Sequence, residues 1–300
     1  MSRSSACSFR SALALVTALS PGVAWGCPCA PGAAPVTALS TPGDAFALRA
    51  SVAALADTAT WDERGRVYLT PRDVSTRRLV FEAAGAWRPW RAIELSALAG
   101  ATLTAADQPG VTVRAASMGD VTARVRWEAV DTWRWRVAAS TAVRIPTGDR
   151  VAGTIANGVA GVGLGAWELS VGGELARRSE SLGEVGLAVD VGVRAPSPRD
   201  GASTWTPGPR ATVTAFGAWR ATRALTLTGS LSHALELDAW RDGERVANSG
   251  TRRLSAAVGV GLRVDRAVWT LGLAADPWID GLGANATATV RATLAVTWTR

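Results

Sequence analysis

Apolar and polar residues alternate along most of this chain, in successive segments of about ten residues. In 119–129, for example, Val121, Ala123 and Val125 fall on one face, whereas Arg124 and Arg126 fall on the other. A period of two is that of a β-strand, in which successive side chains point to opposite sides of the sheet. The pattern therefore predicts an all-β protein whose strands each have one apolar and one polar face.

About twelve such strands can be placed between residue 45 and the C-terminus. The composition does not change within this region, so we predict one domain over 45–300. The predicted strands are 45–56, 77–87, 92–103, 119–129, 133–145, 165–176, 183–194, 209–219, 224–237, 252–264, 267–277 and 286–300.

The connections between these strands alternate between long and short. Outer-membrane barrels have short periplasmic turns and longer external loops, whereas a soluble β-sandwich has no reason to sort its connections by length. We therefore predict a single transmembrane antiparallel up-and-down β-barrel in the cell outer membrane. The long connections are 57–76, 104–118, 146–158, 195–208, 238–251 and 278–285, and the short ones are 88–91, 130–132, 177–182, 220–223 and 265–266.

The first 26 residues have the three parts of a cleavable signal peptide: a basic start, a short apolar stretch and small residues before the cleavage site. Residues 27–44 are rich in Pro, Gly and Ala and predict a flexible periplasmic leader. The leader holds Cys27 and Cys29, for which lipidation of Cys27, a disulfide, a thiol or metal site and no role at all remain open. A zinc site would need a second pair of ligands, so we expect no metal.

Composition narrows the classes further. All 32 basic residues are Arg, and the formal net charge is +7. A basic protein can bind nucleic acid, but here the Arg are spread singly along the predicted strands and no nucleic-acid motif accompanies them. We expect outer-membrane lipid as the surroundings, an unidentified small solute as partner, no nucleic acid, no cofactor and a monomer.

The chain has 14 Trp, and many of them fall at the predicted strand ends. The indole ring prefers the headgroup zone of a bilayer, because it is apolar with a single N–H donor. We therefore predict two aromatic girdles. The external one contains Trp61, Trp205, Trp240 and Trp278, and the periplasmic one contains Trp87, Trp90, Trp127, Trp133, Trp219, Trp269 and Trp298.

Closing the sheet turns its polar face inward. Twelve Arg and seven acids then face the lumen, among them Glu82 and Glu128. The hairpin 119–145 supplies five of these Arg. The excess predicts a positive constriction that mildly favours anions, although a lattice of ion pairs filling a narrow lumen is an open alternative. The predicted inward Arg are Arg49, Arg78, Arg124, Arg126, Arg134, Arg136, Arg144, Arg194, Arg210, Arg253, Arg263 and Arg291, and the other acids are Glu94, Asp120, Glu168, Glu174 and Asp190.

The stretch from Met118-Gly119-Asp120-Val121 to Arg144-Ile145-Pro146-Thr147-Gly148-Asp149 resembles the transporter-like outer-membrane proteins grouped with the meta-pathway phenol-degradation family. The resemblance is strongest over 119–149 and loose from there to the C-terminus. It implies a barrel and a role in the transport of small organic compounds. The motif itself is structural, because Pro146 ends a strand ladder and the residues after it form a turn at the rim. No functional residue is carried over.

Two other functions compete with a channel. One is a structural, non-conducting barrel that braces the envelope. The other is a lipid-modifying enzyme that uses His233, the only His of the chain, which we place on the lipid-facing side of 224–237. A catalytic triad would need a Ser in phase on a neighbouring strand, and Ser230 and Ser232 point to the opposite face. We therefore expect no enzyme activity and no catalytic residue.

Overall fold

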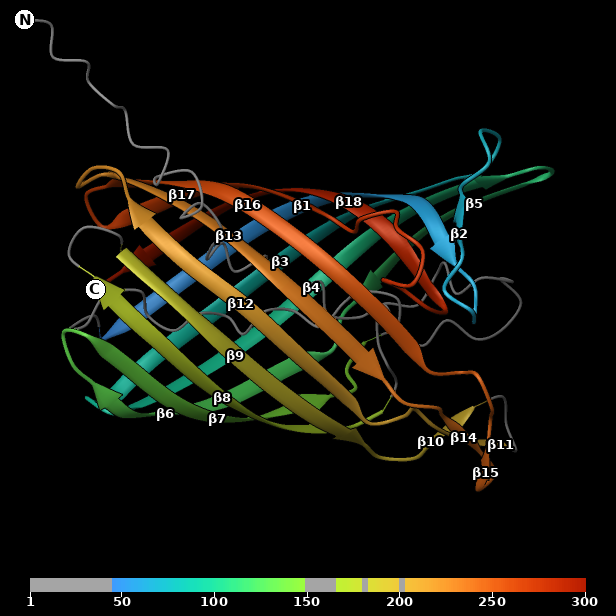
Figure 1. Ribbon diagram of the computed structural model, residues 1–300, viewed down its shortest axis with the longest axis horizontal. Helices are drawn as coiled ribbons and strands as arrows, with labels where there is room; N and C mark the ends of the chain where they lie inside the picture. Colours follow the sequence, from blue (N-terminus) through green and yellow to red (C-terminus); the bar gives the residue numbers. More distant parts are fainter. Residues whose placement is uncertain (1–44, 149–165, 180–182, 200–202) are drawn as a thin grey trace, which may run out of the picture.

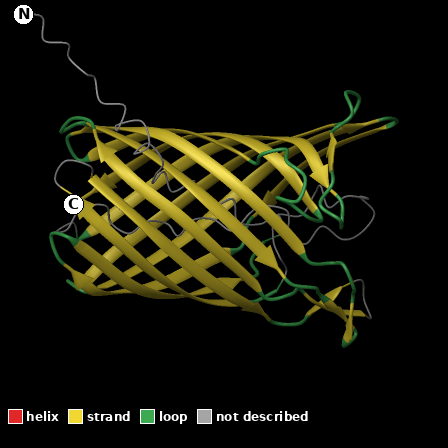
Figure 2. Cartoon of the chain, in the orientation of Figure 1, coloured by secondary structure: helices red, strands yellow, loops and turns green. Residues whose placement is uncertain are grey.

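The computed structural model describes residues 45–148, 166–179, 183–199 and 203–300, which form a closed antiparallel barrel of twelve strands (Figures 1 and 2). The fold class and the twelve predicted strands are confirmed. The barrel strands are β1 (Phe46–Trp61), β3 (Ser75–Trp90), β4 (Ile93–Gln108), β6 (Val121–Asp131), β7 (Trp135–Ile145), β8 (Glu168–Ser179), β9 (Gly183–Arg194), β12 (Arg210–Arg220), β13 (Leu225–Glu236), β16 (Thr251–Val264), β17 (Ala267–Ala275) and β18 (Ala286–Thr299).

The barrel closes where its first and last strands pair. β1 and β18 run antiparallel from Ala47 opposite Thr299 to Trp61 opposite Ala286, with one bulge between Asp57 and Ala59. Every barrel strand is therefore hydrogen-bonded on both sides. In hydrocarbon no water can satisfy backbone N–H and C=O groups, so a sheet can cross a bilayer only without free edges.

The two faces of the sheet differ as the alternation predicts. On β9 the outer face presents Val185, Leu187 and Val191 in exposed positions, and the other strands present similar side chains. The inner face carries Thr, Ser, Arg and Glu side chains that are buried within the barrel, for example Thr122 and Arg126 on β6. An apolar exterior around a polar interior is the arrangement of an outer-membrane barrel.

No helix among the described residues is long and apolar enough to cross a membrane.

The two ends of the barrel differ in their connections, as predicted. At one end, called the inner end here, β3–β4, β6–β7, β12–β13 and β16–β17 are joined by tight turns, and Ala45 donates a backbone hydrogen bond to Arg300 at 2.8 Å. The long connections lie at the opposite, outer end (Figure 1). By the sorting of loop lengths in such barrels, we expect the inner end to face the periplasm.

Two predicted external loops are partly strand. The connection predicted at 57–76 contains the end of β1, the short β2 (Val67–Leu69) and the start of β3. The connection predicted at 104–118 contains the end of β4 and β5 (Val111–Met118), which pair beyond the barrel wall. The predicted loop contains Pro109 and Gly110, but these two residues form only the tight turn between β4 and β5, where Gly110 takes a φ of 78°. A small external sheet adds β10 (Ser197–Arg199), β11 (Ser203–Thr206), β14 (Trp240–Arg241) and β15 (Glu244–Arg245).

The motif that carries the family resemblance closes the outer end of the β6–β7 hairpin. β7 ends at Ile145, immediately before Pro146. The Thr147 hydroxyl accepts a hydrogen bond from the N–H of Val121 at 3.0 Å, and the N–H of Gly148 donates to Asp120 at 3.1 Å. The part of the motif that the structure describes thus holds the ends of two strands together.

The outer end is joined across the barrel seam by Trp61. This side chain is 3% exposed, and its indole N–H donates to the carbonyl of Ile279 at 3.1 Å. A Cβ on Gly283 would lie 2.2 Å from the Trp61 ring, so only glycine allows this approach. Nearby, the backbone N–H groups of Arg66 and Arg64 hydrogen-bond to Asp62 and hold the pKa of this external carboxyl below its ordinary value.

The tryptophans predicted for the inner end lie on the outer surface close to the short turns. Six of them are exposed and Trp219 is half-buried. At the outer end the placement differs, because Trp61 is buried under the 277–285 loop while Trp278 and Trp167 are exposed. Trp205 and Trp240 belong to the small external sheet. The seven inner-end residues are Trp87, Trp90, Trp127, Trp133, Trp219, Trp269 and Trp298.

Replacement of Leu271 by Arg tests which surface faces lipid. Leu271 is 59% exposed in the middle of β17, opposite Val260 and Leu294. We expect L271R to lower the free energy of unfolding by about 2–4 kcal/mol, because an Arg at the bilayer midplane is costly. The matched control V264R, beside the β16–β17 turn, should cost less than about 1 kcal/mol. Denaturant unfolding in lipid vesicles measures the free energy of unfolding of both variants. An equal loss at the two positions would contradict the conclusion that this face of the barrel contacts lipid.

Candidate functional site

The candidate site is the lumen, whose wall carries charged side chains of both signs. Among the described residues, twelve Arg and twelve acidic side chains face inward and are at least partly shielded from solvent. The Arg are Arg49, Arg78, Arg88, Arg124, Arg126, Arg136, Arg144, Arg178, Arg194, Arg210, Arg253 and Arg291, and the acids are Asp57, Glu82, Glu94, Asp120, Glu128, Asp131, Glu168, Glu174, Glu184, Asp190, Glu236 and Asp276.

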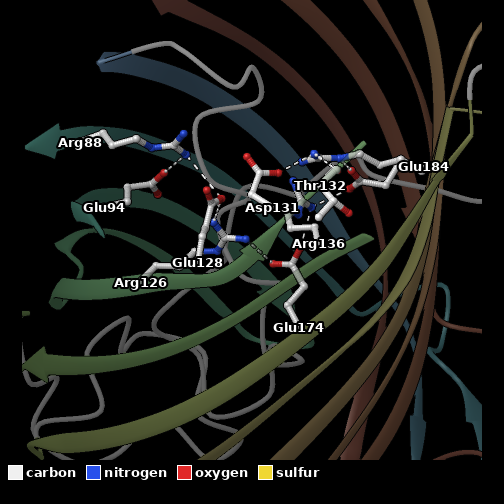
Figure 3. A network of polar contacts seen from close by, with 10 residues as sticks. Arg88, Glu94, Arg126, Glu128, Asp131, Thr132, Arg136, Glu174 and Glu184 are labelled. Carbon is white, nitrogen blue, oxygen red and sulfur yellow. Dashed lines mark hydrogen bonds and ion pairs between the residues drawn. The ribbon is translucent and has the colours of Figure 1, made fainter. Parts of the chain in front are cut away.

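A continuous chain of ion pairs follows the wall near the inner end, from β3 and β4 to β8 and β9 (Figure 3). We call it the inner network. Alternating cations and anions along it are joined across strands, so each charge has at least one partner of opposite sign. Its members are Arg88, Glu94, Arg126, Glu128, Asp131, Arg136, Glu174, Arg178 and Glu184.

The centre of the inner network is Glu174 on β8. Its carboxylate accepts hydrogen bonds from Arg126 on β6, at 3.2 Å, and from Arg136 on β7. Arg126 also pairs with Glu128, and Arg136 also pairs with Glu184. Cross-strand contacts of this kind require the observed register, in which Ala138 of β7 lies opposite Glu174 of β8. These side chains are all largely buried, which makes the loss of one partner costly.

A second cluster, the outer network, surrounds Glu168 at the start of β8. The Glu168 carboxylate lies 2.8 Å from Arg194, 2.7 Å from Arg210 and 3.7 Å from Arg144. Arg194 also pairs with Glu236 at 2.7 Å, and Arg210 with Asp190 at 3.5 Å. The network therefore connects five neighbouring strands, from β7 to β13.

A third group braces the seam side of the barrel. Arg78 on β3 pairs with Asp57 on β1, and Arg253 on β16 lies 3.4 Å from Asp276. Asp276 also accepts hydrogen bonds from the backbone N–H and the hydroxyl of Thr289 on β18.

Arg291 and Arg49 both attract Glu82 electrostatically, and Glu82 accepts a hydrogen bond from Ser51 at 3.1 Å. Together with the third group, this cluster ties β18 to the first strands of the barrel.

The residues predicted for the constriction separate into two groups. Arg124, Arg126, Arg136, Arg144, Glu82 and Glu128 face the lumen. Arg134 does not, because it lies in the β6–β7 turn, exposed, with its guanidinium 4.2 Å from the centre of the Trp133 ring. Arg263 is exposed beside the β16–β17 turn. At Arg134 the alternation was continued into a turn and predicted the wrong direction, since β6 ends at Asp131. Arg263 still belongs to β16, one residue before its end.

Five lumenal acids were missing from the sequence prediction, and they remove the predicted excess of positive charge. Asp57 stood in a predicted loop, and Asp131, Glu236 and Asp276 stood at or beyond predicted strand ends, where the alternation is hardest to follow. Glu184 is the second residue of β9, and its phase relative to Val185 places it inward. That phase was visible in the sequence and could have identified it.

Arg124 stands apart from the other lumenal arginines. Nine of the twelve take part in the ion pairs described above, and Arg49 and Arg291 belong to the charge cluster around Glu82. Arg124 makes no hydrogen bond or ion pair with another described residue. Among charged groups, Asp190 and Glu94 attract it, and Arg126 and Arg210 repel it.

The arrangement around His233 offers little for hydrolysis. The side chain is exposed on the outer face of β13, as predicted. The residues directly opposite it are Val213 on β12 and Leu254 on β16, and neither carries a hydroxyl group. Among the described residues, no group of three or more His, Cys, Asp or Glu is placed to hold a metal ion.

Comparisons with known proteins support the fold. No family model matches the chain, and no curated protein matches its sequence. An outer membrane channel from Pseudomonas putida F1 superposes with a TM-score of 0.71 at 10% identity, covering 89% of this chain and 99% of the channel. The translocator domain of the autotransporter NalP from Neisseria meningitidis gives 0.50 at 12% identity, covering 87% and 90%. The chain therefore has the fold of an outer-membrane barrel, and the resemblance to channel-type barrels is confirmed at the level of the fold.

Replacing Glu168 by Gln tests the outer network. The change leaves three buried arginines without their shared carboxylate, so we expect the free energy of unfolding to fall by about 3–5 kcal/mol. The control is D107N, which removes the exposed Asp107–Arg114 pair at 3.1 Å and should cost less than about 1 kcal/mol. Denaturant unfolding in vesicles measures both. Equal, small effects would show that the lumenal pairs are solvated and contribute little.

Proposed function

We propose that this barrel passes or binds small solutes across the outer membrane, with a mild preference for anions. Its fold is that of an outer membrane channel, and a polar, charged lumen surrounded by an apolar exterior suits the passage of polar solutes. The observation that carries the proposal is the lumenal wall itself. Its charges form networks, and beside them lies Arg124, which makes no ion pair with another described residue.

The source of the anion preference differs from the one predicted. The described lumenal charges balance, so no general excess of Arg favours anions. A local source replaces it, namely Arg124, which pairs with no acid among the described residues. A cation inside a narrow bore attracts anions more strongly than an exposed one. The proposal therefore places the selectivity at Arg124 rather than along the whole hairpin 119–145.

A structural, non-conducting barrel is the second candidate, and the ion-pair networks favour it. They connect neighbouring strands and would stiffen a wall even without any transport. The lumenal position of Arg124 argues the other way. It pairs with no acid in the described part of the chain, and a purely structural lattice gains nothing from a buried cation outside its pairs. Lipid modification by His233 has no comparable support from the residues opposite it.

Single-channel recording of the refolded mature protein in a planar bilayer tests the proposal. Under a KCl gradient we expect steady conductance, with a reversal potential displaced toward that of chloride. Arg124→Glu should move the reversal potential toward that of potassium, because it replaces a lumenal cation by an anion. The control Arg134→Glu makes the same change in charge at the exposed β6–β7 turn and should have a much smaller effect.

A folded barrel that never conducts would favour the structural candidate. A conducting barrel whose selectivity is the same in wild type, R124E and R134E would refute the role of Arg124.

A further inference from the structure

We propose that the inner end of the barrel is a binding surface for the phosphate groups of anionic phospholipids in the inner leaflet of the membrane. This surface lies on the outside of the barrel, so the inference goes beyond the passage of solutes through the lumen. The first observation is charge. Among the described residues, the exposed charged side chains of the inner end, where the C-terminus lies in Figure 1, comprise eight Arg and a single acid, Asp265.

The exposed charges of the outer end are more evenly balanced. In the described part of the chain, seven exposed Arg and five exposed acids lie at that end. Arg64, for example, lies 4.0 Å from Glu63. Arg245 lies 2.7 Å from Asp238. The excess of positive charge on the described surface is therefore concentrated at the inner end, and a surface of one sign attracts groups of the opposite charge.

The exposed Arg of the inner end are spread around the barrel. Arg177 lies near the end of β8, and Arg300 follows β18. Each of the four tight turns contributes at least one more, and these are Arg91, Arg134, Arg220, Arg223, Arg263 and Arg266. Lipid surrounds a membrane barrel on all sides, whereas a compact protein partner would contact only one side. The ring of Arg therefore favours lipid as the partner.

Two of these Arg contact exposed tryptophans of the inner end. The guanidinium of Arg134 stacks on Trp133, and that of Arg177 lies 5.9 Å from the centre of the Trp135 ring. Trp135 and Arg177 are directly opposite each other in the register of β7 and β8. The two pairs adjoin, because the N–H of Arg178 donates a hydrogen bond to the carbonyl of Arg134 at 2.7 Å. Indole rings prefer the headgroup zone, so these guanidinium groups lie at the level of lipid phosphates.

The chemistry of the pairs suits phosphate. Stacking on an indole ring uses the face of a guanidinium group, whereas its N–H donors point outward in the plane of the group. Those donors match two oxygens of a phosphate group through parallel hydrogen bonds. The other Arg of the ring attract a lipid with a net negative charge and repel the choline cation of a zwitterionic lipid. Phosphatidylglycerol should therefore bind more strongly than phosphatidylcholine, although both carry a phosphate.

Native mass spectrometry of the refolded barrel in detergent, titrated with either lipid, tests the inference. Wild type should retain phosphatidylglycerol at lower lipid concentrations than phosphatidylcholine. The double variant Arg134→Gln/Arg177→Gln should bind phosphatidylglycerol about five-fold more weakly or worse, since each Arg beside an anionic lipid contributes roughly such a factor. Arg134→Lys/Arg177→Lys should recover part of the binding, because it restores the charge but not the planar fork.

The matched control is Arg64→Gln/Arg245→Gln, which removes the same charge at the outer end and should bind phosphatidylglycerol as wild type does. Circular dichroism verifies that every variant is folded. Equal binding by wild type and both Gln variants, or equal binding of the two lipids by wild type, would overturn the inference. Displacement of the lipid by an equal concentration of inorganic phosphate would also overturn it, because the surface would then bind a free anion. The conductance test concerns the lumen, so it decides the proposed function separately.

Discussion

The structure depends on the closure of the sheet by β1 and β18. In hydrocarbon each unpaired backbone polar group is costly, so a barrel that leaves one edge open cannot persist there. Residues at the two ends of the described chain are therefore neighbours, joined by the strand pairing, by the Ala45–Arg300 hydrogen bond and at the outer end by Trp61 against the 277–285 loop. Closure also makes the two faces of every strand unequal, since one must face lipid and the other the lumen.

The inward face then decides where the charges lie. About half of the strand residues point into a confined interior, and an Arg placed there cannot leave it for bulk solvent. The chain meets this constraint by pairing the charges across strands, as when Glu174 of β8 binds Arg126 of β6 and Arg136 of β7. The networks are thus a consequence of closure as well as a support for the wall. Arg124 departs from this arrangement, because it forms no ion pair with any other residue that the structure describes, and departures from local consistency are where function is expected.

The strands themselves were predictable because their signal is local. Twelve segments with a period of two, and connections that alternate in length, identify an up-and-down barrel without any knowledge of its contacts. The predictions were wrong or incomplete where the alternation stops. Trp61 lies beyond a bulge at Asp57 and Ala59, and it packs inside the outer mouth rather than in a girdle. Arg134 lies in a turn, where stacking on Trp133 replaces the direction that a strand would impose.

The sequence by itself determined the fold class, the faces of the strands and which end carries the long connections, because each follows from side-chain periodicity and turn residues. Only the tertiary structure decided the charge balance of the lumen. Arg126 and Glu174 are 48 positions apart, and their contact exists because the register of three strands brings them to the same level. Strand register and barrel closure depend on all the strands together and cannot be read from one segment. The same set of lumenal arginines could therefore have formed a positive bore. Here they form a wall in which nearly all of them are neutralised by a neighbouring acid.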